Sequence, residues 1–299
     1  MKIVVGVALL ATLAAGCGDD SSDNPLETKP SPAGAGKTVV VGSAGFPENV
    51  LLGEIYAGAL EAKGVKVEKK LNLGTREVIY NQLKSGGLTV LPEYNGALLA
   101  YLDKNAALPT TTEDTDKAVA AKLPAGLKLL EPSPAQDNDS LTVTAETATK
   151  NNLKTIEDLK PVAGTFTVGG PPTFEGRFKD KLKEVYGLTF KGWTPDRSEG
   201  ANVPTWLKSN KVQVGNIFTT TPAIVINKLV VLEDPKGVFG QQNITPLVNT
   251  AGLDAAAEAA LNAVSAKLTT DDLLGLMKQI AIDKADPAEV AKTWLAAHP

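Results

Sequence analysis

The chain has 299 residues, of which 43% are hydrophobic and 5% aromatic, and its formal net charge is −4. This length is enough for one or two domains with a sizeable core. Lysine and arginine are scattered along the chain and form no dense basic stripe, so the charge pattern excludes nucleic acid as an expected partner.

The chain contains one cysteine, Cys17, and one histidine, His298. A single cysteine cannot form an internal disulfide, and these two residues cannot build a zinc site of the usual Cys/His kind. A Ser-His-Asp triad would have to use the penultimate residue, although chain ends rarely hold catalytic geometry. No spacing singles out a catalytic pair among the 34 acidic residues. We therefore expect no metal, no cofactor and no catalytic residues.

Residues 1–16 have the pattern of a signal peptide. Their apolar run, residues 3–15, is too short to span a bilayer, which needs about 20 residues. The run leads into Leu13-Ala14-Ala15-Gly16-Cys17, which resembles a bacterial lipobox, although Ala14 stands where leucine is usual. The pattern predicts an extracytoplasmic protein anchored to the cell membrane by lipidated Cys17; the alternative is an ordinary secretory signal with a chance cysteine. Residues 17–37 are polar and rich in proline and glycine, as in a flexible tether.

From residue 38, short β-branched runs alternate with helical patterns. Strand patterns occupy residues 38–42, 65–71 and 88–91, and helical patterns occupy residues 47–64 and 75–87. The first helical pattern has proline in its first turn, apolar residues on one face and glycine at its end. This β-α-β-α-β order predicts an α/β fold with a mostly parallel sheet and helices on both faces.

A second set of elements begins near residue 140. Strand patterns lie at residues 140–145, 165–170, 188–193 and 211–218, and helical patterns at 153–160, 174–187, 253–267, 270–282 and 287–297. Sheets of this type bind ligands at the carboxyl ends of their strands. Two such lobes facing each other would trap a small molecule, and Tyr94, just past the third strand, would face that cleft.

Six segments in order carry a resemblance to a known family: VVVGSAGFPENVLLGEIYAGALEAKG, KLNLG, LPEYNGALL, NNLKTIEDLK, KEVYGLTFK and FTTTPAIVINKLVVLEDPKG. They resemble the glycine betaine, choline and quaternary-amine binding proteins of osmoprotectant ABC importers. The resemblance implies a two-lobed class II periplasmic-binding-protein fold. Lobe 1 would contain residues 38–139 and 243–299, and lobe 2 residues 140–242. A ligand between the lobes would favour the closed form, which docks on a permease subunit; we expect a monomer.

Members of this family hold a trimethylammonium group against a box of tyrosine rings. Carried over to this chain, the resemblance implies a ligand site formed by Phe46, Tyr94, Asn95, Ser140, Arg177, Phe218, Thr219 and Gln242. Tyr94 is a kept tyrosine, whereas Ser140, Phe218 and Gln242 stand where relatives have tyrosines. Arg177 would grip a carboxylate through paired hydrogen bonds, and Arg76 would add a second positive group near the cleft.

The changed box leaves alternatives open. The same fold and transporter role could serve a ligand that is not a quaternary amine, namely a hydroxylated or aromatic small molecule. Two other classes are an enzyme that reuses a two-lobed fold and a structural surface lipoprotein without a ligand. The sequence supports no nucleophile paired with a base, which argues against the enzyme.

Overall fold

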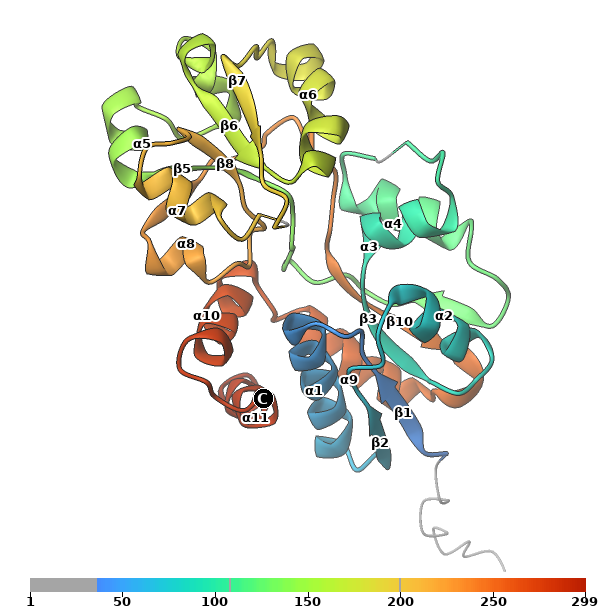
Figure 1. Ribbon diagram of the computed structural model, residues 1–299. Helices are drawn as coiled ribbons and strands as arrows, with labels where there is room; N and C mark the ends of the chain where they lie inside the picture. The colour runs from blue at the N-terminus through green and yellow to red at the C-terminus, as the bar shows by residue number, and fades with distance from the viewer. Residues whose placement is uncertain (1–36, 108, 199) are drawn as a thin grey trace, which may run out of the picture. The chain divides into compact units, whose positions relative to one another are not determined.

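The structure is a computed structural model that describes residues 37–107, 109–198 and 200–299. Its strands form two five-stranded sheets, and we call each sheet with the helices packed on it a lobe (Figure 1). The first sheet has the order β2-β1-β3-β10-β4. Its strands are β1 (Val39–Gly42), β2 (Val67–Lys70), β3 (Val90–Tyr94), β4 (Leu127–Leu129) and β10 (Ile244–Asn249). The predicted signal peptide, Cys17 and most of the predicted tether lie outside the described residues.

The second sheet has the order β7-β6-β8-β5-β9. Its strands are β5 (Leu141–Thr144), β6 (Thr167–Gly170), β7 (Gly192–Pro195), β8 (Val214–Asn216) and β9 (Leu229–Val231). Neighbouring strands β2, β1 and β3 pair in parallel, as do β7, β6 and β8. In each sheet one strand runs against the other four: β10 in the first and β5 in the second. The predicted two-lobed, mostly parallel α/β fold is therefore confirmed.

Each antiparallel strand, β5 or β10, is the first strand that the chain forms after it crosses from one sheet to the other. It passes to the second sheet between β4 and β5 and returns between β9 and β10. The two crossing segments pair with each other, since Gln136 forms a bridge with Asn243 and the Asp137 N–H donates to the Gln242 carbonyl at 3.2 Å. The exact lobe boundaries at residues 139/140 and 242/243 stay a prediction.

Alternating side chains let the first sheet bury both faces. Val39 and Val41 join one apolar core, while Val40 packs against the other. Helices α1, α9, α10 and α11 cover the first face, and α2, α3 and α4 cover the second (Figure 1). Their bounds are α1 Pro47–Ala62, α2 Arg76–Lys84, α3 Asn95–Leu102, α4 Thr112–Ala120, α9 Ala255–Ser265, α10 Thr270–Ala281 and α11 Pro287–Ala297. The pattern confirms helices on both faces of this sheet.

The second sheet is packed between two further apolar clusters. Phe174 and Phe178 of α6 lie in the larger one, against Leu141 and Val168 of the sheet, and α7 and α8 supply the smaller one. The helices of this lobe are α5 Ala145–Asn151, α6 Pro172–Tyr186, α7 Val203–Lys208 and α8 Ala223–Ile226. Among the described residues, no helix combines the length and the apolar character needed to cross a membrane.

Two sequence predictions differ from the structure in this lobe. The helix predicted over residues 153–160 is a single 3-10 turn, η1 (Ile156–Leu159), which Pro161 prevents from continuing. The strand predicted over 188–193 begins only at Gly192, because Leu188 and Phe190 bury their side chains before the chain joins the sheet. The remaining short helices η2 (Ala163–Thr165) and η3 (Thr250–Gly252) lie in connections.

Candidate functional site

A cavity of about 280 Å³ lies where residues from both lobes and both crossing segments meet. The first lobe supplies Phe46, Arg76, Tyr94 and Ala97, the second supplies Arg177 and Phe218, and the crossing segments supply Asp137, Asp139 and Gln242. Phe46 follows β1 and Tyr94 is the last residue of β3. The cavity therefore lies at the carboxyl ends of parallel strands, where such sheets bind ligands.

Three aromatic side chains line this cavity. The ring centroids of Phe46 and Tyr94 lie 6.2 Å apart, with their planes tilted by 30°. Phe46 is 42% exposed and Phe218 is 43% exposed, whereas Tyr94 is only 6% exposed. A large apolar ring held open to solvent costs free energy that a ligand regains by covering it. Ring faces also attract cations.

Buried polar groups hold Tyr94 in place. Its hydroxyl donates a 2.7 Å hydrogen bond to Oε1 of Glu48, in the first turn of α1. Burial, together with the neighbouring charges of Glu48 and Asp137, raises the pKa of Tyr94, so the hydroxyl stays protonated and remains a donor. The ring is therefore fixed by a contact behind the cavity.

The carboxyl groups near the cavity are perturbed by burial. Asp137 Oδ1 accepts a 2.8 Å hydrogen bond from the Thr220 hydroxyl. Burial and the charge of Glu48 raise the pKa of Asp137 to about 7. Burial likewise raises the pKa values of Glu48 and Asp139, although the Arg177 charge opposes the rise at Asp139. Such carboxyls are poised to interact with a positively charged ligand.

The two arginines of the cavity both bind carboxylates. Arg76 Nε lies 3.0 and 3.1 Å from the carboxylate oxygens of Glu93. Arg177 reaches Oδ2 of Asp139 at 2.9 Å, and its guanidinium lies 4.7 Å from the Phe178 ring centroid. About half of the Arg177 side chain is exposed, so it can reach a ligand carboxylate without leaving α6.

Five of the eight predicted site residues line the cavity, namely Phe46, Tyr94, Arg177, Phe218 and Gln242. The other three bind the chain to itself. The Asn95 side-chain oxygen accepts a hydrogen bond from the Asn243 N–H and so joins α3 to the second crossing segment. The Ser140 hydroxyl donates to the Ile217 carbonyl at 2.6 Å. The Thr219 hydroxyl donates to the Gln136 carbonyl at 3.0 Å. Their role in ligand binding stays a prediction.

Sequence reasoning did not find Asp137, Asp139 or Glu48. Glu48 lies in an ordinary helix start, and nothing in its spacing relates it to residues 89 or more positions later. The only available signal was the polar run Gln136-Asp137-Asn138-Asp139 at the first crossing between lobes. Among the described residues, no cluster of three His, Cys, Asp or Glu side chains is arranged to hold a metal ion.

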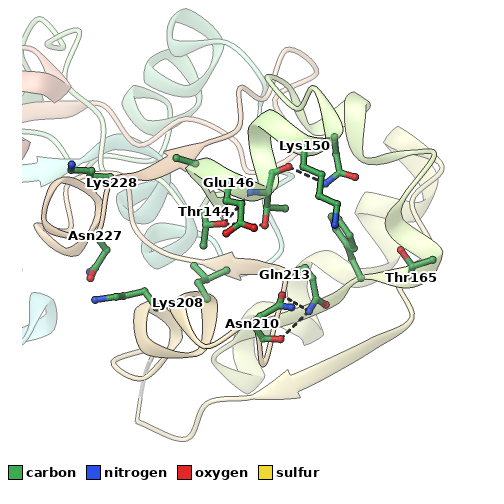
Figure 2. Close-up of a pocket in the computed structure, with 14 residues that line it drawn as sticks. Thr144, Glu146, Lys150, Thr165, Lys208, Asn210, Gln213, Asn227 and Lys228 are labelled. Atoms are coloured by element: carbon green, nitrogen blue, oxygen red, sulfur yellow. Dashed lines mark hydrogen bonds between the residues drawn. The ribbon is translucent and has the colours of Figure 1, made fainter.

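A larger cavity, of about 720 Å³, lies at the opposite end of the second sheet (Figure 2). Thr144 ends β5 there, and Thr165 precedes β6. Its charged side chains are Glu146, Lys150, Lys208 and Lys228. None of the predicted site residues lines it. Of these two cavities, the smaller one is the better candidate ligand site, because it brings together aromatic rings and arginines from both lobes and carboxylates from a crossing segment.

Comparison with known proteins gives concordant results. Residues 37–297 match the family described as "Substrate binding domain of ABC-type glycine betaine transport system". The chain is 29% identical over 282 residues to the glycine betaine-binding protein YehZ of Escherichia coli, covering 88% of this chain and 92% of that protein. It is 25% identical over 280 residues to the ergothioneine transport permease/ergothioneine binding protein EgtU of Helicobacter pylori, covering 91% of this chain but 48% of that protein.

A solved structure entitled "Crystal structure of glycine betaine/carnitine/choline ABC transporter" has the same fold. It aligns with a TM-score of 0.80 at 21% sequence identity, covering 87% of this chain and 98% of the other. At this identity the likeness shows the fold alone and says nothing about a ligand.

Proposed function

Because the chain belongs to the family of substrate-binding domains of ABC-type glycine betaine transport systems, we propose that it captures a small quaternary ammonium compound between its two lobes and delivers it to a permease. The observation that carries this proposal is the set of rings, Phe46, Tyr94 and Phe218, around a cavity that also contains Asp137 and Asp139. Rings and carboxylates both favour a cation, and the rings tolerate its methyl groups.

The ligand site consists of the lining residues of the small cavity. Phe46 and Tyr94 supply one aromatic wall and Phe218 supplies a second, from the other lobe. A ligand that touches both walls links the lobes, which favours the conformation that the permease recognises. Arg177 is the group best placed to receive a ligand carboxylate, in exchange for its bond to Asp139.

The alternative, a hydroxylated or aromatic ligand that is not a quaternary amine, is not favoured. The family description names glycine betaine, and a neutral ligand would not balance the negative charge of the carboxylates in the cavity.

We also propose that the protein binds its ligand without changing it chemically. Recovery of unchanged ligand after long incubation would agree with binding alone, whereas a new product would contradict it.

We propose that the mature protein is a monomer held at the outer face of the cell membrane by a lipid on Cys17. The support is the lipobox-like sequence, with the chain's one cysteine at its end. In cells, Cys17→Ala would release the protein from the membrane fraction, whereas Ser21→Ala, four positions later in the tether, would leave it bound. A Cys17→Ala protein that stays membrane-bound would contradict the anchor.

Calorimetric titration with glycine betaine, choline and carnitine tests the ligand class. We expect saturable one-to-one binding of at least one of them, weakened by Phe218→Ala by about 2- to 30-fold, as for loss of one cation–π contact. Val225→Ala is the matched control, because Val225 is similarly exposed, at 44%, but does not line the cavity. Absence of binding for all three compounds would contradict the quaternary ammonium ligand.

A further inference from the structure

Two carboxyl groups beside the aromatic cavity have no cationic partner within the described part of the chain. Arg76 is engaged by Glu93, and Arg177 by Asp139. Glu48, which is 5% exposed, and Asp137 take part in no ion pair among residues 37–107, 109–198 and 200–299. The site therefore contains an excess of acidic groups over basic ones.

Glu48 and Asp137 each accept a hydrogen bond from a neighbouring hydroxyl group. Tyr94 of β3 donates to Glu48, and Thr220, after β8, donates to Asp137. Both donors are neutral hydroxyls, so they stabilise a carboxylate without balancing its charge. The remaining charged groups of the cavity are Asp139 on the same crossing segment, Arg76 of α2 with Glu93 of β3, and Arg177 of α6.

Two neighbouring carboxyls in a buried site cannot both ionise at low cost. Burial and the neighbouring Glu48 raise the pKa of Asp137 to about 7. Burial also raises the pKa of Glu48. Near neutral pH, the empty site therefore retains a proton that the same groups would lose in water.

We propose that the Glu48–Asp137 pair holds a proton while the cleft is empty and releases it to solvent when the ammonium group of a ligand binds against Tyr94. The inference rests on the proposed function and narrows it. A cation beside the pair stabilises the state in which both carboxyls are ionised. The positive charge of the ligand therefore replaces that of the proton. No covalent bond of the ligand forms or breaks.

This exchange favours a ligand with net positive charge, such as choline, over a zwitterion such as glycine betaine. Both arginines of the cavity already bind carboxylates, so the carboxylate of a zwitterion has to displace Asp139 from Arg177. A ligand without a carboxylate needs no such displacement. The pair therefore acts as a determinant of specificity within the class of quaternary ammonium ligands.

The pH dependence of choline affinity follows from the released proton. Affinity rises with pH while the empty site is protonated and becomes constant above the pKa of Asp137. For release of one proton from a group with a pKa of about 7, choline binds about tenfold more tightly at about pH 8 than at about pH 6. The choline ammonium itself does not titrate.

Isothermal titration of the protein with choline chloride tests the exchange. At about pH 6, the binding heat is measured in two buffers of different ionisation enthalpy, because their difference gives the number of protons released. We expect close to one proton for the wild type and clearly less for Asp137→Asn and for Glu48→Gln. Asp180→Asn, on the exposed side of α6, is the control and should release the wild-type number. Melting curves establish that each variant is folded.

The outcomes separate the two proposals. If neither choline nor glycine betaine binds at any pH, the proposed function fails. If choline binds with the same affinity at both pH values and the same heat in both buffers, the proton exchange fails while the proposed function stands. Full proton release in a folded Asp137→Asn or Glu48→Gln variant would overturn the assignment to this pair; if one of these variants does not fold, the other decides.

Discussion

The Tyr94 hydroxyl donates a 2.7 Å hydrogen bond to Glu48, which joins the end of β3 to the first turn of α1 behind the cavity. The contact fixes the ring that we assign to ligand binding and connects it to a buried carboxyl. Ring and hydroxyl therefore have separable roles in this site.

Substitution of Tyr94 separates these roles. Tyr94→Leu removes the ring face and should weaken binding of choline by about 2- to 30-fold. Tyr94→Phe keeps the face and loses only the bond to Glu48, so it should retain most of the affinity. Titration calorimetry measures both. Equal losses in the two variants would show that the hydroxyl, rather than the ring, carries the effect.

Arg177 should discriminate between zwitterionic and cationic ligands. Arg177→Gln removes the one half-exposed guanidinium of the cavity that could bind a ligand carboxylate, so glycine betaine should bind about tenfold more weakly. Choline should bind at least as tightly as before, because Asp139 loses its positive partner. Lys179→Gln, on the same helix but paired with Glu175, is the control. A parallel loss for both ligands would contradict this role.

Asp137 should lower the stability of the empty protein at neutral pH. Its folded-state pKa is about 7, against an ordinary value of 3.8, so between these values the folded protein binds more protons than the unfolded chain. Stability therefore falls as pH rises through this window. Asp137→Asn should raise the Tm at about pH 8, and the gain should shrink as pH is lowered toward about 4.

Asp158 is a control for this measurement, because its substitution should change the Tm in the opposite direction. Hydrogen bonds from the backbone N–H groups of Thr155 and Lys154 lower its pKa. Asp158→Asn should therefore lower the Tm at neutral pH, and the deficit should fade in acid as the wild-type carboxylate is protonated. A Tm for Asp137→Asn that does not exceed the wild-type value at any pH would contradict the assigned shift.

Gly96 should be required where α3 passes the second crossing segment. A Cβ at this position would overlap the Gln241 carbonyl oxygen, so the backbone would have to move. Gly96→Ala should cost about 1–3 kcal/mol and lower the Tm. Gly176→Ala, in α6 with open space around its Cβ, is the matched control and should be neutral or stabilising by up to about 1 kcal/mol. Equal Tm values for the two variants would contradict the close approach.

The sequence predicted those parts of the fold that depend on local pattern. Alternating strands and helices, and Tyr94 at the end of a strand, follow from periodicity and from the Pro-Glu-Tyr sequence. Strand β10 was not predicted, because Pro246 lies in its middle and proline argues against an interior strand. In the structure Pro246 faces Pro92 of β3, so the two prolines occupy one register position.

The site was less predictable because its chemistry depends on contacts between distant residues. The Glu48 charge acts on Asp137 although the two residues are far apart in the sequence, a relation that no local spacing records. Conversely, Asn95 and Thr219 have the polar character of ligand residues, but their hydrogen bonds hold the crossing segments. Backbone groups at a crossing compete for polar side chains, and that competition is visible only in three dimensions.

The most direct test of the cationic site compares choline with 3,3-dimethyl-1-butanol, the neutral compound in which carbon replaces the ammonium nitrogen. The two have nearly the same shape, so calorimetric titration of both isolates the contribution of charge. The rings and carboxylates of this cavity predict saturable binding of choline and binding of the alcohol that is at least about tenfold weaker. Equal affinity for the two compounds would contradict a site built for a cation.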